Sequence, residues 1–315
     1  MITTLTPSPS LDTEYEIPLL QAGELHRASY FGMRAGGKGV NVARVLTRMG
    51  LEARAIVPLE PTSSEGFIAS AERDSIELEF VEVEGPLRIN TTLLHEGKTT
   101  KINAAAQPWS PKEAKRIAET FLSLAKKSEF AVIGGTLPPA TPAGWITDLV
   151  AEASKRCRIV VDSSGVNLRE AIAARPYLIK PNKEEAQELL GRSILDVVDA
   201  ADAAHEMIAL GAESVLLSLG NLGSIYAASS TTLLAKPAQL QVQSTVGAGD
   251  ALLAGFIGTL DEGPEKALAA ATAWAEATIT NQNLHLDVAV HSSAISRIIS
   301  EKRIVSLTTE KGSKV

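Results

Sequence analysis

Residues 130–162 read FAVIGGTLPPATPAGWITDLVAEASKRCRIVVD and contain, in this order, the patterns of a strand, a helix and a second strand. The two strands are short apolar runs, Phe130–Gly134 and Arg158–Asp162, and glycine and proline residues follow the first of them. The segment Pro142–Arg156 between them has the length and the apolar spacing of a helix. This succession indicates a βαβ unit, whose two strands lie parallel in one sheet.

The same alternation continues on both sides of this unit. Upstream, Pro111–Lys127 has a helical pattern. Downstream we expect strands at Tyr177–Lys180 and Ser214–Ser218 and helices at Lys183–Leu190, Val197–Leu210, Ala248–Leu260, Pro264–Thr280 and Ser292–Lys302. The chain is therefore predicted to be an α/β protein with a parallel sheet flanked by helices.

The N-terminal third is different, because short β-like runs dominate it. These runs are Tyr15–Pro18, Arg27–Met33, Ala53–Pro58 and Leu87–His95, separated by Gly, Pro and Ser. We interpret this region as sheet plus an appended β flap, built from about residues 12–33 and 87–105. One domain is expected over residues 1–306, followed by a small, polar, disordered tail at 307–315.

Composition and charge exclude several classes of protein. The 315 residues carry a net charge of −7 and have a pI near 5.4, which argues against a nucleic-acid-binding face. No run approaches the roughly 20 apolar residues that span a bilayer, and the start lacks a signal-peptide pattern. The single cysteine, Cys157, can form no intrachain disulfide. We therefore expect a cytoplasmic protein without a membrane partner.

The strongest signal for chemistry is Ser244–Asp250, which reads STVGAGD and precedes a helical pattern. Small residues at a helix start let the backbone approach a ligand, and the free N–H groups there bind anions. Asp250 in that first turn would accept the proton of an attacking hydroxyl while the amides stabilise a transferring phosphoryl group. The alternative is a glycine turn in which the acid complements the helix dipole. A dinucleotide-binding loop is excluded, because Leu252 stands where its third glycine belongs.

A second glycine-rich segment, Gly36–Asn41, reads GGKGVN and leads into the predicted helix Asn41–Met49. It would present an ammonium, an amide and bare backbone to a polyhydroxylated ligand. The alternative is a solvated loop before an amphipathic helix. A phosphate-binding Walker loop is rejected, because Gly39 stands where the Mg²⁺-binding Ser or Thr belongs.

A third segment, Lys180–Glu185, reads KPNKEE and places Asn182 and Glu185 on one helix face. These two side chains would order the water shell of Mg²⁺, although Asn182 and Glu185 also fit a helix capping box. The turn Ser218–Gly223 could lie along a nucleotide, with a plain β-turn as the alternative.

In this order, these segments resemble the ribokinase-like (pfkB) carbohydrate kinases, over about Thr6 to Ala277. Ser244–Ile257 fits the C-terminal signature of that family, Gly36–Asn41 its N-terminal signature, and Lys180–Glu185 its Asn-x-x-Glu element. Further matches are to the branch of 1-phosphofructokinases and tagatose-6-phosphate kinases, at Leu11-Asp12, His26–Ala28, Arg88-x-Asn90 and Asp162–Gly165. The resemblance implies a doubly wound, mostly parallel sheet with a small β flap over the sugar, and a homodimer through the flap.

The resemblance also implies the reaction. ATP and Mg²⁺ would phosphorylate a sugar phosphate, with fructose 1-phosphate converted to fructose 1,6-bisphosphate as the first expectation. A tagatose-6-phosphate or fructose-6-phosphate kinase is the second expectation, and a non-catalytic sugar-phosphate-binding regulator is the third.

The implied site residues fall into four groups. Catalysis would involve Asp250 as the base and Gly247, Ala248 and Gly249 as the anion hole. The sugar phosphate would be bound by Asp12, Arg27, Gly37, Lys38, Asn41 and Arg88, with Arg27, Lys38 and Arg88 converging on its phosphate. The nucleotide would be bound by Lys180, Asn182, Ser218, Gly220, Gly223 and Thr245. Mg²⁺ would be held through water by Asn182 and Glu185.

Four segments depart from the pattern of the branch. They are Ser8 and Ser10 in the Pro-rich start, Glu60-Pro61, Ala104–Gln107, and Gly134–Ala140. All four map to the sugar side or the flap, so they put the identity of the substrate in doubt more than phosphoryl transfer.

Overall fold

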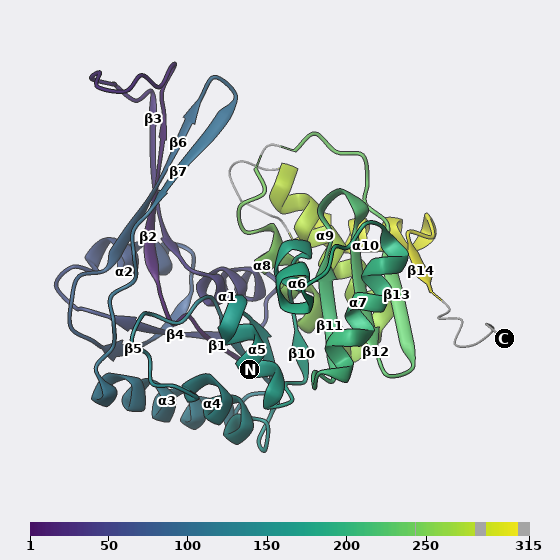
Figure 1. Ribbon diagram of the computed structural model, residues 1–315. Helices are drawn as coiled ribbons and strands as arrows, with labels where there is room; N and C mark the ends of the chain where they lie inside the picture. Colours follow the sequence, from purple (N-terminus) through teal and green to yellow (C-terminus); the bar gives the residue numbers. More distant parts are fainter. Residues whose placement is uncertain (243, 281–287, 308–315) are drawn as a thin grey trace.

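The computed structural model describes residues 1–242, 244–280 and 288–307, and for 288–291 it describes the backbone alone (Figure 1). Within this part of the chain, a ten-stranded sheet forms the centre of the molecule. Its strands, in spatial order, are β14 (Ile304–Ser306), β13 (Thr231–Ala235), β12 (Ser224–Ala228), β11 (Ser214–Ser218), β10 (Leu178–Ile179), β9 (Arg158–Asp162), β8 (Phe130–Gly134), β1 (Ile2–Leu5), β4 (Ala53–Leu59) and β5 (Glu77–Glu82).

The order of the strands creates a crevice beside β1. Neighbouring strands run parallel from β5 to β11, and β12, β13 and β14 add an antiparallel extension. From β1 the chain moves outward to β4 and β5, and it then returns to β8 on the other side of β1. In open α/β sheets such a reversal places the ligand site at the carboxyl ends of the two strands.

Helices cover both faces of this sheet. One face packs against α1 (Lys38–Arg48), α2 (Glu65–Arg73), α8 (Ala248–Ile257) and α9 (Pro264–Thr280), with α10 (Val288–Ser300) outside α9. The other face packs against α3 (Pro111–Ala125), α4 (Trp145–Ala153), α5 (Gly165–Ala173), α6 (Lys183–Leu190) and α7 (Val197–Ala209).

Successive residues along each central strand point alternately into these two cores. In β9, Val160 packs into the first core, while Ile159 and Val161 pack into the second, and all three are fully buried. The predicted doubly wound, mostly parallel sheet is confirmed. The described residues contain no helix long and apolar enough to cross a membrane.

A separate four-stranded sheet forms the flap and projects away from the body (Figure 1). Its order is β3 (Tyr30–Gly36), β2 (Ser10–Glu16), β6 (Arg88–His95) and β7 (Lys98–Asn103). Strand β2 is longer than the expected run, and β3 has the expected length but is shifted by three residues, because their pairing extends from Ser10–Gly36 at the base to Glu16–Tyr30 at the far end.

Several predicted boundaries were wrong for local reasons. Helix α4 begins at Trp145 instead of Pro142, because Gly144 adopts a left-handed φ of 75° and caps the helix there. Helix α1 begins at Lys38 instead of Asn41, after Gly37 with a φ of 116°. Of the tail predicted at 307–315, residues 308–315 lie outside the described residues, whereas Leu307 is ordered and its N–H donates to the Thr232 carbonyl oxygen at 2.8 Å.

Candidate active site

The first turn of α1 lies directly on the crevice between β1 and β8. A Cβ atom on Gly39 would come within 2.7 Å of the Leu5 carbonyl oxygen, and one on Gly134 within 2.7 Å of the Gly39 nitrogen. The contact is therefore backbone against backbone, and only glycine fits on either side. This corrects the predicted loop at Gly36–Asn41, since Lys38 is the first residue of the helix.

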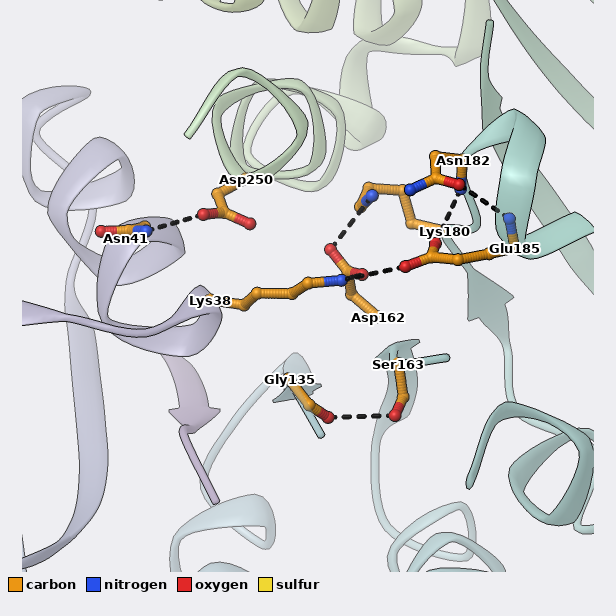
Figure 2. A network of polar contacts seen from close by, with 9 residues as sticks. All are labelled: Lys38, Asn41, Gly135, Asp162, Ser163, Lys180, Asn182, Glu185 and Asp250. Carbon is orange, nitrogen blue, oxygen red and sulfur yellow. Dashed lines mark hydrogen bonds and ion pairs between the residues drawn. The ribbon is translucent and has the colours of Figure 1, made fainter. Parts of the chain in front are cut away.

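The second glycine-rich motif brings Asp250 to the same place. Gly247 has a left-handed φ of 79° and caps α8, and Asp250 follows in the first turn with 7% of its surface exposed. The Asn41 Nδ2 atom donates a hydrogen bond of 2.7 Å to Asp250 Oδ2 (Figure 2). Two motifs more than 200 positions apart in the sequence thus meet side chain to side chain.

The surroundings of Asp250 hold its pKa close to neutral pH. Burial raises that pKa from the ordinary 3.8 to about 6, and the nearby negative charge of Asp162 acts in the same direction. The hydrogen bond from Asn41 and the charges of Lys180 and Lys38 oppose this rise. A carboxylate with such a pKa is well matched to general-base catalysis.

A buried acid, Asp162, links the two halves of the site. Lys38 Nζ lies 2.6 Å from Asp162 Oδ1 and 3.6 Å from Glu185 Oε1, and Lys180 Nζ lies 3.1 Å from Asp162 Oδ2 (Figure 2). Burial alone would lower the pKa of Lys38, but the charges of Asp162 and Glu185 outweigh it and raise the pKa overall. The Lys38 ammonium group is therefore fully charged at neutral pH.

Asp162 was not predicted as a site residue. The signal in the sequence is an aspartate that ends a run of buried β-branched residues, at the carboxyl end of β9. In a parallel sheet this position faces the ligand crevice.

Lys180 lies at the opening of the predicted anion hole. A Cβ atom on Gly249 would be 3.3 Å from Lys180 Nζ, so the ammonium group borders the first turn of α8. Glycine at position 249 leaves the space between this cation and the amide groups of the helix open. A phosphoryl group placed there would meet a positive charge and a helix N-terminus together.

The Asn182 and Glu185 side chains form the capping box that the sequence allowed. Asn182 Oδ1 accepts from the Glu185 N–H and Glu185 Oε2 from the Asn182 N–H, both at 2.8 Å. Glu185 Oε1 remains directed at Lys38. Residues 1–242, 244–280 and 288–307 contain no cluster of three or more metal-ligating side chains, so a cation here would need water and phosphate ligands, as Mg²⁺ prefers.

The turn after β11 lies beside this helix start. Ser218 forms a parallel bridge with Asn182, which brings two of the predicted nucleotide segments together. The turn itself is a short 3₁₀ helix, Gly220–Leu222, and Gly223 has a φ of 101° and packs on the Ala235 carbonyl. Thr245, the remaining predicted nucleotide contact, is exposed before α8, and its carbonyl oxygen accepts from the Ala248 N–H at 3.3 Å.

On the sugar side, the predicted contacts lie at the base of the flap. Asp12 Oδ1 accepts hydrogen bonds from Ser10 Oγ at 2.7 Å and from Asn90 Nδ2 at 3.0 Å. The Arg88 guanidinium group donates to the carbonyl oxygens of Ser8 at 2.7 Å, Pro9 at 3.2 Å and Ala104 at 3.3 Å. Arg88 therefore ties two backbone segments, at Ser8-Pro9 and at Ala104, to its own strand β6, a structural role that the sequence did not reveal.

The prediction that Arg27 lies beside Lys38 and Arg88 was wrong. It is exposed in the loop beyond the Glu16–Tyr30 pair, whereas Gly36, two residues before Lys38, pairs with Ser10 at the opposite end of β2. Six strand steps of about 3.3 Å put roughly 20 Å between the two ends. Within one chain, the three cations cannot converge on a single phosphate.

Three of the unusual segments meet in one cavity beside Arg88. Its lining includes Ser8, Glu60 and Gln107. Ser8 Oγ also donates to the Thr136 carbonyl oxygen at 2.9 Å, which links it to the fourth unusual segment. These departures therefore change one connected region next to the sugar side.

Comparison with known proteins agrees with this geometry. The model of the pfkB family of carbohydrate kinases matches residues 11–288. The chain belongs to this family. As a pfkB family member, it is a phosphotransferase that acts on an alcohol group of a carbohydrate, and ATP fits as the phosphoryl donor.

This pfkB protein is also similar to individual phosphofructokinases, in sequence and in structure. The 1-phosphofructokinase of Vibrio cholerae serotype O1 is 32% identical over 260 residues, covering 81% of each chain. The 1-phosphofructokinase of Escherichia coli K12 is 31% identical over 287 residues, covering 90% of this chain and 92% of the relative. The structure of phosphofructokinase-2 from Escherichia coli in complex with fructose-6-phosphate has a TM-score of 0.86 at 27% identity, and covers 95% of this chain and 99% of that one.

Proposed function

We propose that this pfkB kinase transfers the γ-phosphoryl group of Mg·ATP to fructose 1-phosphate and forms fructose 1,6-bisphosphate. The observation that carries the proposal is the buried Asp250 in the first turn of α8, hydrogen-bonded to Asn41 of the glycine-rich segment. The 1-phosphofructokinases of two bacteria, at 31% and 32% identity over most of the chain, support the choice of substrate.

Asp250 is the proton acceptor in this proposal. Its Oδ2 atom is engaged by Asn41, so Oδ1 takes the proton of the attacking hydroxyl group. With a pKa of about 6, most of the carboxylate is ionised at neutral pH and remains basic enough to accept that proton.

The transferring phosphoryl group would lie between Asp250 and the first turn of α8. The N–H groups of Gly249 and Asp250 have no carbonyl one turn back and point towards it, as at any helix start. Lys180 at the edge of this turn adds a positive charge. These groups stabilise the charge that is distributed over the equatorial oxygens in the transition state.

The sugar phosphate would occupy the crevice between α1 and the base of the flap. Lys38 and Arg88 supply the positive charge, and Asp12, Asn41 and the Gly37 backbone supply contacts to hydroxyl groups. Because Arg27 lies at the far end of the flap, the phosphate of the substrate would be held by two cations of this chain, Lys38 and Arg88, instead of three.

Ser218, Gly220, Gly223 and Thr245 would lie along the nucleotide. Asn182 and Glu185 are arranged to hold the water shell of Mg²⁺, because Glu185 Oε1 is not used by the capping box. When bound, Mg²⁺ neutralises charge on the β- and γ-phosphates of ATP.

The flap is the proposed contact between two copies of the chain in the cytoplasm. In the register of its strands, Met33 and Ile102 lie on one face together with Phe31 and Ile89, and these four side chains are 37% to 60% exposed. Polar residues such as Asp12 and Asn90 lie on the opposite face. A thin sheet with one apolar face is marginal in water and gains stability when a second copy covers that face.

ADP release measured on fructose 1-phosphate, fructose 6-phosphate, tagatose 6-phosphate and the free sugars tests the proposal. Fructose 1-phosphate should have the highest kcat/KM. Preference for fructose 6-phosphate, the ligand of the neighbouring Escherichia coli structure, would support the second candidate function instead. Sugar-phosphate binding without turnover on any of them would indicate a regulator.

A further inference from the structure

The middle of α1 carries a buried arginine, Arg44, whose side chain is 4% exposed. Its guanidinium group donates from Nε to Asp74 Oδ2 at 2.7 Å, and from Nη2 to the Ala35 carbonyl oxygen at 2.5 Å. The third hydrogen bond runs from Nη1 to Asn41 Oδ1 at 2.5 Å. A buried charge is unfavourable unless it is paired and hydrogen-bonded, and three different segments supply the acceptors here.

The bond to Asn41 determines which way that amide points. An arginine has only donors, so the amide oxygen must face Arg44 and the amide nitrogen must face Asp250. In the flipped orientation, the NH₂ group would oppose the guanidinium group and the oxygen would oppose the Asp250 carboxylate. Both contacts would be repulsive, so one orientation is strongly selected.

We propose that Arg44 is a positioning residue for the proton acceptor: it fixes the Asn41 amide, and Asn41 in turn holds Asp250 Oδ2 and leaves Oδ1 free for the substrate hydroxyl. The proposal rests on Asp250 acting as the base. The chain of contacts runs from Asp74 at the end of α2, through Arg44 and Asn41, to Asp250 in α8.

The other charged groups around this chain of contacts are few. Asp250 is influenced by Lys38 of α1, Asp162 of β9 and Lys180 after β10. Arg44 is influenced by Asp74 and Arg48, and by Arg34 of β3. Burial and the charge of Arg34 lower the pKa of Arg44 to about 10, so Arg44 remains charged over the range in which Asp250 titrates.

A simpler interpretation is that Arg44 is a structural link between α1, α2 and the end of the flap strand β3. That role would affect stability. It would leave the titration of Asp250 unchanged, because the link through Asp74 and Ala35 does not touch the carboxylate. The two interpretations therefore differ in a property that can be measured in the absence of substrate.

The test compares Arg44→Lys, Asn41→Ala and the double variant. Lysine keeps the charge, but its single nitrogen cannot reach Asp74, Ala35 and Asn41 together. The readout is a ¹³C-NMR titration of the Asp250 carboxyl carbon, assigned by its loss in Asp250→Asn, together with the acid limb of kcat/KM. Arg48→Lys is the matched control, because Arg48 lies one turn further along α1 and also pairs with Asp74, at 3.4 Å.

Arg44→Lys should raise the pKa of Asp250 from about 6 to about 7, because the carboxylate loses a fixed donor. Asn41→Ala should raise it similarly, the double variant should raise it no further than Asn41→Ala does, and Arg48→Lys should leave it unchanged. A wild-type titration in Arg44→Lys, full additivity in the double variant, or an equal rise in Arg48→Lys would each overturn the proposal.

Should Arg44→Lys fail to fold, Arg44→Met with Asp74→Asn removes both opposite charges together and still frees the Asn41 amide. The same rise is expected, and a wild-type titration again overturns the proposal. The NMR titration needs no turnover, so it remains decisive if the substrate panel fails. Conversely, an active kinase whose Asp250 titrates independently of Arg44 loses only the positioning role.

Discussion

Replacing Asp250 by asparagine removes the proton acceptor while keeping the size and shape of the side chain. The new amide oxygen can still accept the hydrogen bond that Asn41 now gives to Asp250 Oδ2, so folding and ATP binding should be preserved. Turnover should fall by roughly 10²- to 10⁴-fold, the usual contribution of a positioned general base, or about 3–5 kcal/mol of barrier.

The same change should stabilise the fold. The folded-state pKa of Asp250 is raised from 3.8 to about 6, so the ionised acid opposes folding. This unfavourable contribution is fully present above about pH 6 and absent below about pH 4, and the pKa difference corresponds to about 3 kcal/mol. The free energy of unfolding of Asp250→Asn should therefore exceed that of the unmutated protein by up to about 3 kcal/mol at pH 8, and the two should be equal at pH 4.

Steady-state ADP release and urea unfolding at the two pH values check both parts. Asp148→Asn is the matched control, because α4 also begins after a left-handed glycine and carries this exposed acid in its first turn. The control should retain activity and show no gain in stability at pH 8. Near-normal turnover in Asp250→Asn would refute the assignment of Asp250 as the catalytic base. Asp250 would then only complement the dipole of α8.

Three further changes separate the remaining assignments. Glu185→Gln keeps an acceptor for the capping box but removes the charge that faces Lys38, so the Mg²⁺ concentration for half-maximal activity should rise with only a small fall in Tm; a large fall in Tm with an unaltered Mg²⁺ response would assign only a cap. Arg88→Ala should weaken the binding of fructose 1-phosphate by roughly 10- to 150-fold, because one charge-assisted hydrogen bond is lost, and should have little effect on the binding of ATP. An equal loss of activity on free fructose would show that Arg88 acts through the backbone carbonyls it holds. Sedimentation should show a dimer that Ile102→Lys dissociates, and a fully active monomer at micromolar concentration would contradict pairing through the flap.

The main sheet could be predicted where its strands are continuous apolar runs. Strands β8, β9 and β11 have the predicted first and last residues, because both faces of each strand are buried and the apolar run is continuous. Strand β1 was missed because it contains Thr3 and Thr4, which are fully buried. Thr3 satisfies its hydroxyl group with Ser128 Oγ at 2.7 Å, a contact across 125 positions that no local pattern reveals.

The candidate site was predictable to the extent that glycines and short motifs mark it. Asp250, Asn41 and Lys38 were identified from such motifs and lie together. Arg27 was misplaced because its position depends on how far β2 and β3 pair, which is a property of the strand register. Arg44 looks like an ordinary charged residue in an amphipathic helix, and its role becomes visible only when the buried contacts to Asp74 and Asn41 are known.

The contact between α1 and the carboxyl ends of β1 and β8 has a consequence for how sharply the reacting groups are placed. A packing contact made of side chains can adapt to a new neighbour by changing rotamers. The peptide groups that meet at Gly39 and Gly134 have no such freedom. A single methyl group at either position would displace the helix as a rigid body and move Lys38 and Asn41 together. A saturation mutagenesis screen should therefore find these two glycines, which have no side chain to take part in the chemistry, as intolerant of substitution as Asp250 itself.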